Sequence, residues 1–200
     1  EFDNLLDPYD HMESLMKKAY RSNIQTIEKT YGLIDSTVIE GVAQEIISCR
    51  NIYLFGIGSS GIVCEDFQHK LLRIGKTSIY YTDTHLQLTA VPNMQKDDLA
   101  FFVSYSGKTK EIVTAAKWAK RVGIKSVAIT QSAYNDLGKL VDMVITIPIE
   151  EKELRIGATS SRLSSLVVID LLYYGVARHD KEETHKSIVD TRKIIDEIQK

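Results

Sequence analysis

Five short apolar runs, separated by longer stretches with helical periodicity, constrain the fold of this 200-residue chain more than any other feature of its sequence. An apolar run of four or five residues suits a buried strand, and a helical stretch between two runs supplies the crossover that parallel strands need. The alternation predicts an α/β fold, in which a five-stranded parallel, flavodoxin-like doubly wound sheet has helices on both faces. The predicted strands are residues 52–55, 78–81, 99–103, 126–129 and 143–147.

Helical periodicity predicts helices between these strands and also before and after the sheet. At the start of the second helix, Thr37 and Glu40 have capping-box spacing. The segment 161–177 is apolar nearly all round, which predicts a buried or subunit-interface helix. We expect one domain over residues 10–200, with residues 1–9 a disordered segment or a cloning remnant. The predicted helices are residues 11–31, 35–49, 60–74, 108–122, 161–177 and 181–200, with short ones after Thr84 and near Leu137.

Composition excludes several classes of function. The net charge is −2, so the chain has no long-range positive field to attract nucleic acid. No apolar run reaches the roughly 20 residues of a membrane span, and no signal peptide opens the chain. Cys49 and Cys64 lack metal-ligand spacing. We therefore expect a cytoplasmic protein with buried or idle thiols, no metal site, and no contact of its own with DNA or a membrane.

Two loops rich in serine and glycine follow the first and third predicted strands. The first, residues 55–61, reads F-G-I-G-S-S-G, and the second, residues 103–111, reads V-S-Y-S-G-K-T-K-E. Ligands of open α/β sheets bind beyond the carboxyl ends of the strands, where both loops lie. The second loop combines the hydroxyls of Ser104, Ser106 and Thr109 with Gly107, directly before a helix. Hydroxyl and N–H donors at a helix N-terminus favour an anion, so this loop predicts a phosphate site.

The two loops also fit other interpretations. Ser106 could simply cap the following helix, although capping needs only one hydroxyl. The first loop fits the dinucleotide pattern G-x-G-x-x-G with Asp83 about 20 residues on, which makes NAD binding an alternative, but Asp83 can equally cap the short helix after it. An ATP P-loop is excluded because Phe102 occupies the position of its first glycine. We therefore predict no cofactor.

Both loops, together with G-A-T-S-S-R at residues 157–162, resemble the sugar isomerase (SIS) domain over about residues 35–180. Residues 155–162 and the apolar helix that contains I-D-L-L-Y are similar to the effector domain of RpiR-type transcriptional regulators. The resemblance implies a dimer or higher homo-oligomer that binds a small phosphorylated sugar, with the phosphate on the second loop and Ser59 and Ser60 facing the sugar. It also implies DNA contact through an upstream helix-turn-helix domain, which nothing in this sequence matches.

Five further residues complete the predicted ligand set: Tyr105, Lys108, Glu153, Ser161 and Arg162. Tyr105 would lie over the sugar or pack at the edge of the loop. Arg162 would pair with the phosphate or with a carboxylate near Asp170 across an interface.

Three functions fit these features. The favoured one is a phosphosugar sensor that controls transcription, with the long first helix linking the sheet to a DNA-binding domain. The alternative is an aldose–ketose isomerase, which needs a general acid and base beside the sugar; Glu153 and His85 are the candidates, although Glu153 equally fits a solvated surface charge. A purely structural dimerisation module is disfavoured, because a site without a ligand need not retain three hydroxyls around a glycine.

Overall fold

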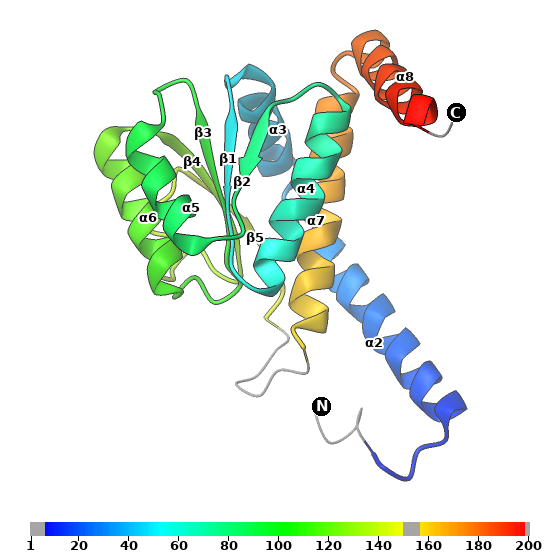
Figure 1. The fold of residues 1–200 in the computed structure, drawn as a ribbon. Coiled ribbons are helices and arrows are strands. Elements are labelled where there is room, and N and C mark those ends of the chain that lie inside the picture. Colours follow the sequence, from blue (N-terminus) through cyan, green and yellow to red (C-terminus); the bar gives the residue numbers. More distant parts are fainter. Residues whose placement is uncertain (1–6, 150–156, 199–200) are drawn as a thin grey trace.

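The computed structural model describes residues 7–149 and 157–198, and it confirms the predicted parallel sheet (Figure 1). The strand order is β2-β1-β3-β4-β5, the flavodoxin-like doubly wound order, and every neighbouring pair is parallel. The strands are β1 (Ile52–Phe55), β2 (Ser78–Tyr80), β3 (Leu99–Val103), β4 (Lys125–Thr130) and β5 (Met143–Thr146).

Helices cover both faces of the sheet, as predicted (Figure 1). One face carries α3, α4 and α7, and the other carries α5 and α6. The bounds are α2 (Met12–Leu33), α3 (Ser36–Ser48), α4 (Ser59–Arg73), α5 (Thr84–Ala90), the 3-10 turn η1 (Val91–Asn93), α6 (Lys110–Val122), α7 (Thr159–Ala177) and α8 (Lys181–Ile198).

The central strand β3 shows why the sequence requires two covering layers. All five of its residues are buried. Phe101 and Val103 belong to the apolar cluster with α3, α4 and α7, whereas Ala100 and Phe102 belong to the cluster with α6. Successive side chains of a strand point to opposite faces, so an uninterrupted apolar run is stable only between two layers of helices.

Two local predictions are wrong. The predicted helix near Leu137 is a series of turns over residues 133–142. The N–H of Leu137 donates to Gly107 O instead of entering a helical ladder, and a Cβ on Gly138 would lie 2.5 Å from Ala133 O. The predicted capping box of α3 is also absent, because Asp35 is the N-cap and its carboxylate accepts the N–H of Thr37 at 2.8 Å.

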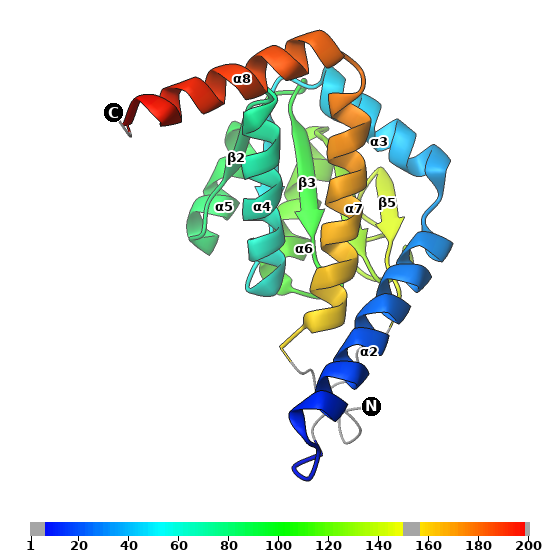
Figure 2. The ribbon, with the colours of Figure 1, turned by 90° about the vertical axis from the view of Figure 1, so that its right-hand side faces the viewer.

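Helix α2 extends beyond the body of the domain. Its C-terminal half packs on α7, where the hydroxyls of Thr30 and Ser164 lie 2.8 Å apart. Its N-terminal half projects past the end of α7, and α8 lies across the opposite end of the domain (Figure 2). None of the helices within residues 7–149 and 157–198 is long and apolar enough to cross a membrane.

Both cysteines are free thiols. Cys64 is fully buried in the core beside α4, and burial raises the pKa of its thiol. Cys49 is half-buried, and burial raises its pKa as well. Because the thiolate is the reactive form, both environments agree with the prediction of idle thiols.

A buried carboxylate joins the amino ends of β1 and β3. Asp98 is 1% exposed and accepts hydrogen bonds from Arg50 Nε at 3.1 Å, Asn51 Nδ2 at 3.0 Å and the Gln95 N–H at 2.8 Å. Burial by itself raises the pKa of Asp98, but the hydrogen bonds from Arg50, Gln95 and Asn51 outweigh this effect and lower the pKa below its ordinary value.

We expect Asp98→Ala to lower the free energy of unfolding by about 1.5–3 kcal/mol at pH 7, because four N–H donors on three residues lose a charged acceptor. The neighbouring Asp97→Ala is the control. Its carboxylate is 64% exposed and lies 3.7 Å from Arg50 Nε, so a change within about 0.5 kcal/mol is expected. Reversible denaturant unfolding followed by circular dichroism measures both variants, and equal losses would contradict this role for Asp98.

The same measurement has a predicted pH dependence. A carboxyl whose folded-state pKa is lowered stabilises the fold above its ordinary pKa, and this contribution is lost as the pH falls through the folded-state pKa. The difference in the free energy of unfolding between the native chain and Asp98→Ala should therefore become smaller below about pH 4.

Candidate functional site

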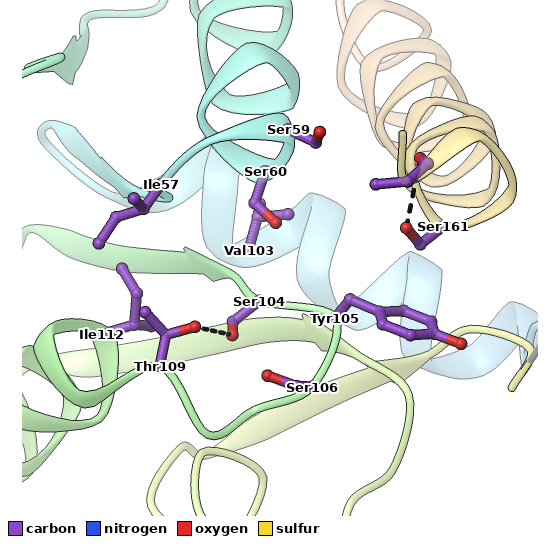
Figure 3. A pocket seen from close by; sticks show the side chains of 11 residues that line it. Ile57, Ser59, Ser60, Val103, Ser104, Tyr105, Ser106, Thr109, Ile112 and Ser161 are labelled. Carbon is purple, nitrogen blue, oxygen red and sulfur yellow. Dashed lines mark hydrogen bonds between the residues drawn. The ribbon is translucent and has the colours of Figure 1, made fainter. Parts of the chain in front are cut away.

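A cavity of about 160 Å³ opens at the carboxyl ends of β1 and β3 (Figure 3). In the order β2-β1-β3-β4-β5, successive strands are added on one side of β1 and then, from β3 on, on its other side. Doubly wound folds bind their ligands at this switch point between β1 and β3. The residues that line the cavity are Ile57, Ser59, Ser60, Val103, Ser104, Tyr105, Ser106, Thr109, Ile112, Ala158 and Ser161.

The second loop curls around one side of this cavity. Ser104 Oγ and Thr109 Oγ1 lie 3.3 Å apart, and the Lys108 N–H donates to Ser106 Oγ over 3.3 Å (Figure 3). Gly107 has a φ of +64°, a conformation that favours glycine, and its N–H donates to Ser104 O. Ser106 does not cap α6: the N-cap is Thr109, whose side chain makes no capping bond. The simple capping interpretation is therefore wrong.

Turns 133–142, which the sequence had suggested were helical, support the second loop from behind. A Cβ on Gly107 would lie 2.2 Å from the Asn135 side chain, so the two are in direct contact. Asn135 Nδ2 donates to Thr130 Oγ1 at 2.7 Å, and Thr130 Oγ1 lies 3.1 Å from the Tyr105 carbonyl oxygen, to which it donates. These residues were missed in the sequence, where Asn135 carries only a general turn signal.

The first loop turns directly into α4. Gly58 is the N-cap of α4 and has a φ of +60°. A Cβ on Gly56 would lie 2.7 Å from both Cys64 Sγ and Ser60 O, so this glycine allows the strand end to approach the helix closely. Ser59 and Ser60 in the first turn of α4 line the cavity, opposite the second loop (Figure 3).

Asp83 has the structural role that the sequence offered as an alternative to dinucleotide binding. Its Oδ1 accepts the N–H of Leu86 at 2.9 Å, and it is the N-cap of α5. The capping interpretation is thus confirmed, and the formal G-x-G-x-x-G match loses the observation that most favoured NAD.

The third wall of the cavity is the start of α7. Ala158, at the N-cap, has a φ of +53°, and Ser161 one turn later is buried and lines the cavity together with Tyr105 (Figure 3). Tyr105 is 6% exposed and lies in the apolar core, so it both packs at the loop edge and lines the cavity.

Some predicted ligand residues lie elsewhere. Lys108 is exposed, Arg162 is half-buried and His85 is exposed on α5, and none of them lines the cavity. Asp170, near which a partner for Arg162 was expected, pairs with Lys70 Nζ at 2.6 Å. Glu153 lies outside the described residues.

The electrostatics of the cavity come from the backbone. Three helices begin at its wall: α4, α6 and α7. Each helix N-terminus has a partial positive charge of about half a unit and free N–H donors. The cavity residues that the structure describes include no Lys, Arg, His, Asp or Glu. In the described part of the chain, no group of three or more His, Cys, Asp or Glu side chains could hold a metal ion.

Solved structures share this architecture. The Vibrio vulnificus NanR protein complexed with ManNAc-6P is 27% identical with a TM-score of 0.87, over 92% of this chain and 69% of that chain. The sugar isomerase domain of an RpiR transcription factor from Sphaerobacter thermophilus has a TM-score of 0.81 at 19% identity, over 90% and 98% of the two chains. The second likeness shows the fold alone.

Sequence comparison finds transcriptional regulators. The uncharacterized HTH-type transcriptional regulator YbbH of Bacillus subtilis is 36% identical over 94% of this chain and 67% of its own length. The HTH-type transcriptional regulator RpiR of Escherichia coli K12 is 29% identical over 92% of this chain and 62% of its own length. The chain spans about two thirds of the length of these relatives. The SIS domain model matches residues 45–174, and the chain therefore belongs to the SIS domain family, with relatives among the RpiR-type regulators.

Proposed function

We propose that this chain is the phosphosugar-binding effector domain of an RpiR-type transcriptional regulator. The observation that carries the proposal is the convergence of three helix N-termini and a set of hydroxyl groups on one cavity at the ends of β1 and β3. NanR, the 27% identical neighbour, has ManNAc-6P in its complex, which supports a sugar phosphate as the class of ligand.

The second loop is the proposed phosphate site. The phosphate would accept hydrogen bonds from the hydroxyls of Ser104, Ser106 and Thr109 and from N–H groups near Gly107 at the start of α6. The hydroxyls of Ser104 and Thr109 are already 3.3 Å apart and can turn toward a common acceptor. A dianion is held here by dipoles and neutral donors, as at other helix N-termini.

The sugar would lie between the first loop and the start of α7. Ser59 and Ser60 supply hydroxyls from one wall, and Ser161 and Tyr105 line the other. These are short neutral groups suited to hydrogen bonds with sugar hydroxyls. Lys108 and Arg162 would contribute long-range positive charge near the opening.

A sensor fits the cavity better than an isomerase does. Aldose–ketose isomerisation needs a general acid and base beside C1 and C2 of the sugar. Among the described cavity residues, only Tyr105 has a titratable side chain, and His85 is exposed on α5. The sequence relatives are named as transcriptional regulators. Isomerisation through Glu153 is the alternative that the activity assay below tests.

The mechanism we propose is a shift between two arrangements of a dimer. Phosphosugar must bind one arrangement more tightly than the other in order to move an attached DNA-binding domain. Helix α2, which projects from the domain, is the proposed connection to a helix-turn-helix domain of the kind named in the relatives (Figure 2). Such a regulator would act in the cytoplasm.

The proposed dimer would use the outer side of α7. This helix buries Val168, Ile169 and Leu172 against the sheet, but Tyr174 is 62% exposed and several apolar neighbours are only half-buried. Met12, Met16 and Tyr20 on α2 are also exposed. A second copy of the chain would cover both sets.

Light scattering coupled to size-exclusion chromatography should give twice the mass of one chain. Tyr174→Glu should shift the protein toward the monomer, because a charge at an apolar contact is costly to bury. Tyr134→Glu is the control, since Tyr134 is also an exposed tyrosine, 84% exposed against 62% for Tyr174, and lies in the turn region outside α7. A native chain that runs as a monomer at micromolar concentration would contradict the dimer.

Removal of single hydroxyls from the second loop should weaken sugar-phosphate binding. A thermal-shift screen of sugar phosphates, parent sugars and inorganic phosphate selects the ligand, since a ligand of the native state raises the melting temperature. Calorimetry should then show at least tenfold weaker binding for Ser106→Ala and for Thr109→Val, because each loses a hydrogen bond to a charged group worth about 1.5–3 kcal/mol.

Ser132→Ala is the matched control for these variants. Ser132 Oγ accepts the Tyr134 N–H at 3.1 Å outside the cavity, so affinity should be unchanged. A melting-temperature increase with NAD and none with any sugar phosphate would overturn the proposal in favour of a dinucleotide site.

The chain should not interconvert aldose and ketose phosphates. Proton NMR of each bound sugar phosphate in D₂O, incubated with the protein, should show neither a new sugar nor exchange of the C2 proton. Turnover that Ser106→Ala abolishes would instead establish the isomerase, because contaminating enzyme activity would not follow the variant.

A further inference from the structure

A buried glutamine behind the first loop holds the backbone at the end of β1. Gln87 lies on α5 and is 3% exposed. Its Oε1 accepts the Gly56 N–H at 3.1 Å, and its Nε2 donates to Gly56 O at 3.0 Å and to Tyr81 O at 2.7 Å. One side-chain amide therefore binds both polar backbone groups of a single glycine and also the carbonyl of the residue that follows β2.

The position of Gly56 explains the importance of these bonds. The ladder between β1 and β2 ends at the pair Leu54 and Tyr80, and Gly56 directly follows β1. Here the chain leaves the sheet and turns toward the cavity. The Gln87 amide supplies hydrogen-bond partners beyond the last paired residues of β2, so it continues the pairing of the sheet through a side chain.

Gly56 is also packed against the part of α4 that lines the cavity. A Cβ on Gly56 would lie 2.7 Å from Ser60 O, and Ser60 with Ser59 forms one wall of the cavity. With so little space, a displacement of the Gly56 backbone must displace the first turn of α4. Protein interiors transmit such shifts because they are closely packed.

We propose that Gln87, which does not line the ligand cavity, is a positioning residue that sets affinity for the sugar part of the ligand. By fixing both backbone groups of Gly56, it holds Ser59 and Ser60 at the orientation that meets the sugar. This proposal rests on the proposed phosphosugar function. The phosphate part, on the second loop, does not depend on Gln87.

A variant pair separates positioning from simple stabilisation. Gln87→Leu removes the amide at similar volume, and Gln68→Leu is the matched control. Gln68 Nε2 donates to Ser78 O at 3.0 Å, at the amino end of β2, whereas the cavity lies at the carboxyl ends of the strands. Both variants lose a side-chain bond to the backbone at one end of β2, but only Gln87→Leu removes bonds to the first loop. In that variant Gly56 O keeps the hydrogen bond from the Tyr80 hydroxyl at 3.3 Å, whereas the Gly56 N–H loses its side-chain acceptor.

The binding probes are ManNAc-6P, or the sugar phosphate with the largest thermal shift if ManNAc-6P does not bind, and inorganic phosphate. Measured well below every melting temperature, Gln87→Leu should bind the sugar phosphate roughly tenfold more weakly, an effect typical of lost orienting partners. Its affinity for inorganic phosphate, followed by NMR titration, should remain native. Gln68→Leu should bind both probes with native affinity.

Gln87→Glu adds a readout that a merely structural role would not produce. A carboxylate can accept the Gly56 N–H but repels the carbonyl oxygens of Gly56 and Tyr81, whereas the protonated acid can donate to one of them. Burial raises the pKa of a carboxyl group, so sugar-phosphate affinity relative to the native chain should recover as the pH falls from 8 to about 5.5.

The native chain at each pH corrects for the ligand phosphate, which itself titrates near pH 6. Ionisable neighbours are the same in both proteins: Tyr80 on β2, Tyr81 directly after it, Asp83 before α5, and Glu111 of α6, which lines a small cavity with Gln87.

The outcomes are distinguishable. If the native chain binds no sugar phosphate, the proposed function itself fails. If the native chain binds and Gln87→Leu binds equally well, or loses affinity for inorganic phosphate to the same degree as for sugar phosphate, only the positioning role is overturned. The positioning role is supported if Gln87→Leu loses affinity for the sugar phosphate alone and if the sugar-phosphate affinity of Gln87→Glu recovers at low pH.

Discussion

The parallel pairing of β1 with β3 is the constraint on which the rest of the structure depends. The pairs run in register from Ile52 with Leu99 to Phe55 with Phe102, so both strands end at the same level of the sheet. The crossovers that follow must start from that edge, which places the first turns of α4 and α6 at the same end of the sheet, on opposite faces. The start of α7 then closes the third side of the cavity.

Because the cavity is built from helix starts, the proposed binding of an anion would need no charged side chain among the described residues that line it. Backbone dipoles and hydroxyl groups are already oriented and cost little to desolvate compared with a buried lysine or arginine. The same arrangement requires exact backbone shape, since the donors cannot move independently. Both serine-rich loops are accordingly supported from behind by a buried or half-buried side-chain amide, Gln87 for the first and Asn135 for the second.

These supports have different physical origins. Gln87 bonds to the backbone of the first loop directly, whereas Asn135 packs on Gly107 and bonds to Thr130, which donates to the carbonyl of Tyr105. Glycine is required at both Gly56 and Gly107, because a Cβ at either would lie within 3 Å of other atoms. Close packing, of Gly56 against α4 and of Gly107 against Asn135, therefore explains two of the glycines that mark the loops in the sequence.

The sequence by itself determined the sheet and the two loops. Buried parallel strands must be continuous apolar runs, and loops at their carboxyl ends must contain the polar groups that bind a ligand, so both leave a local pattern. Only the tertiary structure decided that residues 133–142 form turns, and that Gln87 and Asn135 support the loops. These features depend on contacts between residues distant in the chain, such as the bond from Leu137 N–H to Gly107 O, and such contacts leave no periodicity to recognise.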